Sequence, residues 1–318
     1  SSFSFQSFST SGCLLPLASI SFSISTCLSF SSPYPCTSVF IIESIRAELS
    51  GMRNFIVMTD GAAVPQTVLQ FDDEYECWLG NQADDFNFTD FDENTRATVF
   101  YTTGTTGVPK GVYYTHRQLV LHTLAAGMAL TAPAVRQRFH SEDVYMPLTP
   151  MFHVHAWGIP YIATLLGLKQ VYPGRYASDM LLKLLREEQV TCSHCVPTLL
   201  KMVLTAAQAS AVDLRGWKVV VGGSVLPHAL ASQALEMGVE CFAGYGLSET
   251  APILTLAQLT ASNNTQDSIM VGALTDLFCA GRAIPLVDLQ IVDEAMQLQT
   301  HDAQSSGEIV VRAPWLTQ

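Results

Sequence analysis

The stretch TTGTTGVPKG, residues Thr102–Gly111, gathers four threonines, three glycines and one lysine within ten positions. It follows a β-rich run at 98–101 and precedes a helical pattern. Glycine lets the backbone turn tightly and approach a ligand closely, threonine supplies hydroxyl donors, and Lys110 adds a positive charge. These groups are suited to holding a polyphosphate. The spacing is not that of the P-loop, in which Gly-Lys-Ser/Thr follows a four-residue gap. The alternative is a flexible hairpin or linker, which so long a string disfavours.

On both sides of this stretch, short β-rich runs alternate with helical patterns. Such alternation is typical of βαβ units, so we predict an α/β fold with mainly parallel sheets flanked by helices. The expected strands are 54–58, 97–102, 143–148, 169–172, 190–195, 217–221, 239–243, 287–292 and 308–311. The expected helices are 116–130, 156–166, 178–188, 198–209 and 227–237.

The first forty residues differ from the rest, with fourteen serines and no charged side chain before Glu43. They lack the basic start and continuous apolar run of a secretory signal, and the arginines of a transit peptide. We therefore expect residues 1–40 to be an atypical leader, disordered or non-homologous, and 41–318 to be the folded domain.

Composition narrows the class of protein. The net charge of −12 argues against a surface that binds nucleic acid. No stretch is apolar enough to predict an integral membrane segment. Cys192 and Cys195 form a C-x-x-C, but no second cysteine pair follows at zinc spacing, which favours buried, reduced thiols. A cytoplasmic location fits, with peripheral membrane association left open.

Four further segments occur in order after the Gly/Thr stretch. They are PMFHVHA at 150–156, GGS at 222–224, GYGLSET at 244–250, and Gly281-Arg282 followed by VDLQIVD at 287–293. Together with TTGTTGVPKG this set resembles the adenylate-forming superfamily, which includes acyl-CoA synthetases, coumarate-CoA ligases, luciferases and peptide-synthetase adenylation domains. The whole run is most similar to medium- and long-chain fatty-acid–CoA ligases. The resemblance implies most of the large N-terminal domain of that fold, truncated at both ends.

The resemblance also implies a chemistry. A carboxylate would attack the α-phosphorus of ATP, pyrophosphate would leave, and the thiol of coenzyme A would then displace AMP. No protein nucleophile is needed, so positioning and neutralisation of phosphate charge carry the catalysis. Glu249 would hold Mg²⁺, Tyr245 would stack on adenine, and Ser248 replaces the family's usual threonine. The implied catalytic residues are Lys110, His153 and Glu249, and the implied nucleotide-binding residues are Thr102, Thr103, Gly104, Thr105, Thr106, Gly107, Gly222, Gly223, Ser224, Gly244, Tyr245, Gly246 and Ser248.

Three histidines, His153, His155 and His194, are candidates for a role in the site or in the core. The motif favours a site role for His153, as a donor to the acyl carboxylate or α-phosphate. In an extended segment His155 would share a face with it. For His194, core and site-lining roles are both open. Val154, His155 and Trp157 are the expected substrate contacts. Peptide-synthetase adenylation domains mark an amino-acid substrate with an Asp in this segment. Because 152–157 carries no carboxylate, the resemblance implies an aliphatic acid rather than an amino acid as substrate.

The resemblance implies that the chain stops just before the family's Thr-Gly-Asp segment and that the small C-terminal domain, with its adenylation lysine, is not included. Activity of this chain alone is therefore doubtful. The alternatives are a non-catalytic nucleotide- or acyl-binding remnant and an aryl, coumarate-type ligase. Chain-length preference and oligomeric state are left open.

Overall fold

The structure is a computed structural model that describes residues 42–49, 51–52, 54–59, 66–83, 85, 87–102, 110–258, 279–300, 302 and 304–317. The serine-rich leader lies outside the described residues. The chain divides into two compact units, Ser1–Asp90 and Phe91–Gln318, and each is described by itself.

The first unit contains a short parallel pair, β1 (Ile56–Val57) and β2 (Asp73–Glu74), followed by α2 (Tyr75–Gly80). Glu74 begins α2 because its carboxylate accepts hydrogen bonds from the first free amides of the helix, those of Glu76 and Cys77. A 3₁₀ turn, η2 (Arg46–Glu48), places the Arg46 guanidinium 4.2 Å above the ring of Phe55.

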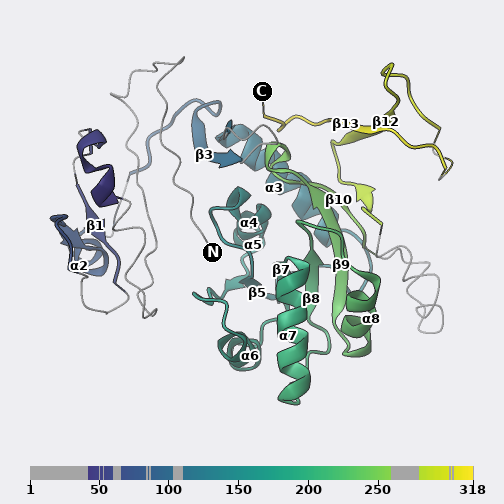
Figure 1. The fold of residues 1–318 in the computed structure, drawn as a ribbon, viewed down its shortest axis with the longest axis horizontal. Coiled ribbons are helices and arrows are strands. Elements are labelled where there is room, and N and C mark those ends of the chain that lie inside the picture. Colours follow the sequence, from purple (N-terminus) through teal and green to yellow (C-terminus); the bar gives the residue numbers. More distant parts are fainter. Residues whose placement is uncertain are drawn as a thin grey trace. The chain divides into compact units, whose positions relative to one another are not determined.

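The second unit is built on a seven-stranded sheet in the order β11-β10-β9-β8-β7-β5-β6 (Figure 1). Its strands β5 to β9 are mutually parallel, whereas β10 pairs antiparallel with both of its neighbours, β9 and β11. This arrangement confirms the predicted α/β fold with a mainly parallel sheet. The strands are β5 (Val144–Pro147), β6 (Lys169–Gln170), β7 (Cys192–Cys195), β8 (Lys218–Val221), β9 (Glu240–Gly246), β10 (Ile253–Leu256) and β11 (Arg282–Ala283).

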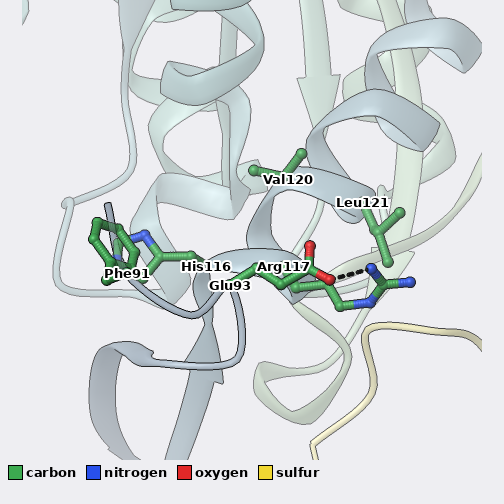
Figure 2. Close-up of a pocket in the computed structure, with 6 residues that line it drawn as sticks. All are labelled: Phe91, Glu93, His116, Arg117, Val120 and Leu121. Carbon is green, nitrogen blue, oxygen red and sulfur yellow. Dashed lines mark hydrogen bonds and ion pairs between the residues drawn. The ribbon is translucent and has the colours of Figure 1, made fainter. Parts of the chain in front are cut away.

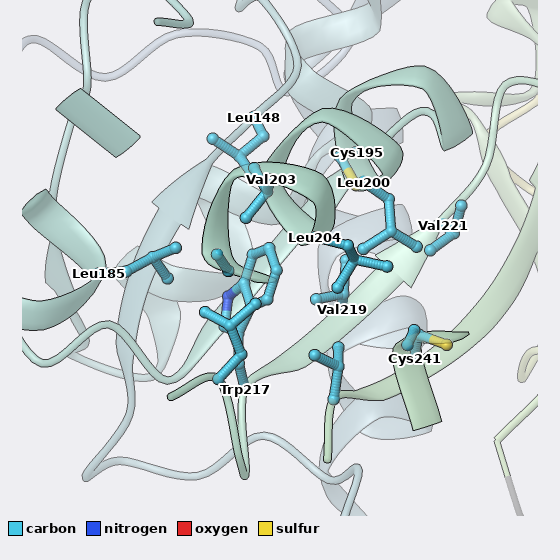
Figure 3. Packing of buried hydrophobic residues seen from close by; sticks show 14 of the residues in the cluster. Leu148, Leu185, Cys195, Leu200, Val203, Leu204, Trp217, Val219, Val221 and Cys241 are labelled. Atoms are coloured by element: carbon cyan, nitrogen blue, oxygen red, sulfur yellow. The ribbon is translucent and has the colours of Figure 1, made fainter. Parts of the chain in front are cut away.

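Helices cover both faces of this sheet because the buried strand residues are apolar on both sides. On one face Tyr145, Val220 and Phe242 pack with α3 (His116–Thr131) and α5 (Ile159–Leu165). On the other, Val219, Val221 and Cys241 pack with α6 (Ser178–Glu187), α7 (Pro197–Ala209) and α8 (His228–Glu236). Figure 3 shows this second cluster around Leu200, Leu204 and Trp217.

Two antiparallel hairpins complete the unit. One joins β12 (Asp288–Val292) to β13 (Glu308–Arg312). The other joins β3 (Arg96–Thr102) to β4 (Lys110–Thr115). The sequence analysis did not predict β4, but the helix that it expected at 116–130 follows the strand as α3. Thr115 then begins α3 through a capping box with Gln118.

The amino edge of the parallel sheet is fixed by a buried ion pair. The Lys218 ammonium lies 2.6 Å from Oδ2 of Asp143, and the Thr191 hydroxyl donates to Oδ1 of the same carboxylate at 2.6 Å. These residues stand at the starts of β8, β5 and β7. This amino edge therefore has a structural role, and it lies at the opposite ends of the strands from the predicted motifs.

Two predictions made from composition can be compared with the residues that the structure describes. Burial raises the pKa of the Cys192 and Cys195 thiols, as expected of buried cysteines. In the described ranges no helix combines the length and the apolarity that a bilayer crossing requires.

Candidate active site

Most of the predicted motifs meet at the carboxyl edge of the parallel sheet. The segment 150–157 follows β5, the glycines at 222 and 223 follow β8, and Gly244–Gly246 ends β9. In open α/β sheets the carboxyl ends of the strands form the usual ligand crevice. The fold therefore brings together motifs that lie about a hundred residues apart in the chain.

Glycine is required at this edge because the backbones approach closely. A Cβ atom on Gly222 would lie 2.8 Å from the carbonyl oxygen of Gly244 and 3.1 Å from the Trp157 ring. Gly223 has a φ of +75°, a region that glycine enters without steric cost. The Trp157 indole thus lies directly against the two glycine backbones.

A left-handed turn places that indole. Val154, His155, Ala156 and Trp157, which form α4 (Val154–Trp157), have φ values of 45°, 54°, 49° and 62°. Four successive non-glycine residues in this region are strained, since each costs of order 1 kcal/mol or more. The expectation that 153–155 is extended, with both histidines on one face, is therefore wrong: His153 is exposed and His155 is buried.

His155 holds the turn to the β3–β4 hairpin. Its Nε2 lies 2.7 Å from the Thr98 hydroxyl, and its ring packs on Phe100 and Tyr161. Burial lowers its pKa to about 4, so the ring is neutral. These contacts make His155 a packing residue in this structure, and its predicted substrate contact stays a prediction.

His194 lies on β7 beneath Trp157, with the two ring centroids 4.9 Å apart. Its Nδ1 is 2.9 Å from the Tyr145 hydroxyl, and its Nε2 is buried without a hydrogen-bond partner. Burial lowers its pKa to about 3. His194 is thus a neutral residue of the core, and its ring contacts the Trp157 indole that lies against the glycine edge. His153, by contrast, is exposed, and its ring contacts Phe152.

Glu249 lies in the 3₁₀ turn η3 (Ser248–Thr250), directly after β9, with its side chain exposed. The Thr250 hydroxyl stabilises the turn because it accepts from the Leu247 amide at 2.9 Å and donates to the Pro252 carbonyl at 2.6 Å. Close to the end of the chain, the Trp315 indole donates to the Thr250 carbonyl at 3.0 Å. The Glu249 carboxylate therefore projects from a well-fixed turn.

The β3–β4 hairpin joins this edge through Tyr114. Its hydroxyl donates to the Ser248 carbonyl at 2.7 Å and accepts from the Ala251 amide at 3.0 Å. Thr102 pairs with Lys110 at the end of the hairpin, and the Lys110 side chain is exposed. Thr103, Gly104, Thr105, Thr106 and Gly107 lie outside the described residues, so their phosphate-binding role stays a prediction.

A shallow pocket elsewhere, at the amino end of α3, is lined by Phe91, Glu93, His116, Arg117, Val120 and Leu121 (Figure 2). Arg117 forms an ion pair with Glu93 across it at 2.7 Å, and both side chains are about half exposed. None of the predicted site residues lines this pocket, which separates it from the carboxyl edge.

The residues at the carboxyl edge fit Mg²⁺·ATP. The backbones at Gly222, Gly223 and Gly244 are closely packed against their neighbours, and an exposed carboxylate and an exposed lysine stand on neighbouring elements. In the part of the chain that the structure describes, no group of three or more possible metal ligands exists. A single exposed carboxylate, that of Glu249, suits Mg²⁺, which usually takes one or two carboxylates together with phosphate oxygens and water.

Tyr114 and Trp315 contact this edge although neither lies in a predicted motif, and Thr250 lies in GYGLSET but had been given no role. The position of Tyr114 four residues after Lys110 was the available signal. Nothing in the sequence around Trp315 indicated its contact with the Glu249 turn.

Comparisons with known proteins identify the family. A family model described as AMP-binding enzyme matches residues 36–318. A long-chain-fatty-acid–CoA ligase of Thermus thermophilus is 38% identical over 87% of this chain and 49% of its own length. A 3-methylmercaptopropionyl-CoA ligase of Ruegeria pomeroyi is 32% identical over 89% of this chain and 52% of its own.

Among solved structures, the N-terminal domain of FACL13 from Mycobacterium tuberculosis superimposes with a TM-score of 0.64 at 22% identity. The match covers 88% of this chain and 67% of that one, and it shows a shared fold. The chain spans about half the length of the curated relatives it matches. By sequence and by fold, the chain belongs to the AMP-binding enzyme family.

Proposed function

We propose that this chain is part of an ATP-dependent acid–thiol ligase that forms AMP and converts a fatty acid to its coenzyme A thioester. The observation that carries the proposal is the convergence of the Glu249 turn, the glycine edge and the strand bearing Lys110 on one end of the parallel sheet. Positively and negatively charged groups beside glycine backbones are suited to binding a nucleoside triphosphate together with its metal ion.

In the proposed reaction, a carboxylate oxygen of the acid forms a bond to the α-phosphorus of ATP, and the bond to pyrophosphate breaks. The thiol sulfur of coenzyme A then bonds to the acyl carbon, its proton is lost, and AMP leaves. Lys110 and the Gly/Thr loop would neutralise the β- and γ-phosphates, and Glu249 would hold Mg²⁺, which offsets the charge on the leaving pyrophosphate.

Other residues would bind and orient. Tyr245 and the glycines at 222, 223, 244 and 246, with Ser224 and Ser248, would contact the nucleotide. His153, exposed at the start of the left-handed turn, would donate a hydrogen bond to the acyl carboxylate or the α-phosphate. Val154 and Trp157 would border the acyl chain.

An aliphatic acid is favoured by the apolar character of 154–157 and by the named activities of the relatives. Those relatives include both a long-chain fatty-acid ligase and a ligase for a short thioether acid, so chain length is left to measurement. A cytoplasmic enzyme, with or without peripheral membrane contact, is the location that suits these soluble cosubstrates.

The test is ATP–pyrophosphate exchange by this chain with fatty acids of six to eighteen carbons and 3-methylmercaptopropionate. Exchange that requires an acid and is lost in Lys110→Ala supports the proposal. Lys201→Ala is the matched control, because Lys201 is also exposed but lies on α7. Measurable ATP binding without exchange for any acid would favour the non-catalytic remnant, and exchange with coumarate alone would favour an aryl ligase.

A further inference from the structure

Tyr114 joins two parts of the candidate site that are 134 residues apart in sequence. Its side chain has no exposed surface. The hydroxyl donates to the Ser248 carbonyl and accepts from the Ala251 amide, so it contacts the backbone on both sides of Glu249. The Tyr114 hydroxyl thus contacts the Glu249 turn at two points.

The turn needs such support. Ala251 has a φ of +70°, a left-handed conformation that alanine rarely adopts. Close approach of the backbone adds to the constraint, because a Cβ on Gly246 would lie 1.5 Å from the Pro252 carbonyl oxygen. Inside a protein, a buried amide without an acceptor is costly, and the Tyr114 hydroxyl is the acceptor for Ala251. Burial also raises the pKa of Tyr114, so the hydroxyl keeps the proton that it donates.

The other end of the link is Lys110. Lys110, Val112 and Tyr114 lie at alternate positions of β4, so their side chains point to the same face of the strand. Val112 and Tyr114 are buried, whereas Lys110 is exposed at the end of the hairpin. Four residues of strand span about 13 Å. The strand therefore sets the separation between the Glu249 turn and Lys110.

We propose that Tyr114 is a positioning residue, whose hydroxyl fixes the Glu249 turn against the strand that carries Lys110 and so sets the geometry in which Mg²⁺·ATP is bound. This role rests on the proposed function, because it assumes that Glu249 and Lys110 face the same triphosphate. A positioning role differs from ordinary packing in one respect. Loss of the Tyr114 hydroxyl should weaken metal-dependent nucleotide binding more than the loss disturbs the fold.

The fold should survive loss of the hydroxyl because neighbouring contacts remain. The Ile253 amide donates to Nε2 of His122 at 3.1 Å, and the Trp315 indole holds the Thr250 carbonyl. In Tyr114→Phe the ring still packs on Phe100. This variant therefore removes one oxygen and leaves the other anchors of the turn in place.

A matched control exists at the opposite edge of the sheet. The Thr191 hydroxyl also donates one hydrogen bond, to Asp143, and accepts one from a backbone amide, that of Val144 at 3.0 Å. Thr191→Val removes this hydroxyl at similar volume. Both variants lose one donated and one accepted hydrogen bond, but only Tyr114→Phe does so next to Glu249.

The experiment measures the affinity of the full chain for ATP with excess Mg²⁺ and with EDTA, together with amide hydrogen exchange. We expect Tyr114→Phe to weaken Mg²⁺·ATP binding about tenfold, the change that one lost buried hydrogen bond typically produces. Binding of metal-free ATP should change less than twofold. The Ala251 amide should exchange at least tenfold faster in this variant, and Thr191→Val should leave all three quantities within twofold of the original chain.

Two outcomes would overturn the role, and they are distinguishable. If the unsubstituted chain binds Mg²⁺·ATP and Tyr114→Phe binds it as tightly as Thr191→Val does, Tyr114 is only a packing residue. If the unsubstituted chain binds no Mg²⁺·ATP, the proposed function itself fails and the role fails with it.

Discussion

Replacing Gly222 with alanine adds one methyl group at the point where β8 ends and the Trp157 indole lies against the glycine backbone. The new Cβ would lie 2.8 Å from the Gly244 carbonyl oxygen and between 3.1 and 3.2 Å from two ring atoms of Trp157. Ordinary contacts between carbon atoms are about 3.5–4.0 Å. The oxygen belongs to the neighbouring strand β9 and cannot move cheaply, so the indole must shift.

Overpacking of this kind typically costs about 1–3 kcal/mol. In domains of this size each kcal/mol lowers the melting temperature by about 2–4 °C. Because the displaced indole borders the edge at which we place the nucleotide, we also expect the affinity for Mg²⁺·ATP to fall by at least tenfold. The assays are thermal unfolding and titration calorimetry on the full chain.

Gly127→Ala is the matched control. It adds the same methyl group in the interior of α3, where its nearest neighbour is an Ile162 atom at an ordinary 3.6 Å. Alanine is favoured over glycine there by about 0.5–1 kcal/mol, so this variant should be as stable as the original chain and bind nucleotide normally. A Gly222→Ala chain with unchanged stability and unchanged affinity would refute the close packing that we describe at this edge.

Three further predictions concern the buried ion pair, the buried histidine His122 and the metal. Asp143→Asn leaves the buried Lys218 ammonium uncompensated, so the free energy of unfolding in urea should fall by about 3–5 kcal/mol, while an unchanged midpoint would contradict the pairing. Burial lowers the pKa of His122 to about 4, below the value of about 6.5 in an unfolded chain. As the pH falls, the unfolded state therefore binds the proton before the folded state does. The stability that His122 contributes is complete above about pH 6.5 and should decline by about 3 kcal/mol toward pH 4. His122→Gln should reduce this dependence of the unfolding free energy on pH, and an identical dependence would exclude the lowered pKa of His122. Glu249→Gln should weaken Mg²⁺·ATP binding at least tenfold and leave metal-free ATP binding within twofold, and equal losses in both conditions would place the metal elsewhere.

The sequence was sufficient for the fold class because the central strands are short apolar runs separated by helices with clear limits. The runs at 192–195, 218–221 and 288–292 all fall within predicted strands. Four strands were not predicted: the two-residue strands β2 and β11, and the longer strands β4 and β10. β4 follows a glycine-rich stretch and is only six residues long, and β10 comes directly after Pro252, so local composition indicated turns at both places.

The site could be predicted only in part, for physical reasons. Motifs indicated which residues gather at the carboxyl edge, because strand ends in a parallel sheet meet there. The left-handed turn at 154–157 could not be predicted, since no residue in it favours a positive φ. Tertiary contacts impose that conformation, above all the bond between His155 and Thr98. The link through Tyr114 is likewise a long-range contact, and a tyrosine in a strand is ordinarily a packing residue.

The most direct test of the central claim is photolabelling of the full chain with an azido-ATP analogue in the presence of Mg²⁺, followed by peptide mapping. The account predicts labelled peptides from 98–116, 222–226 and 243–252, with labelling abolished by excess ATP and strongly reduced in Lys110→Ala. Competitive labelling that maps instead to the amino edge of the sheet, around Asp143 and Lys218, or to the surface pocket at Phe91 and Arg117, would contradict it.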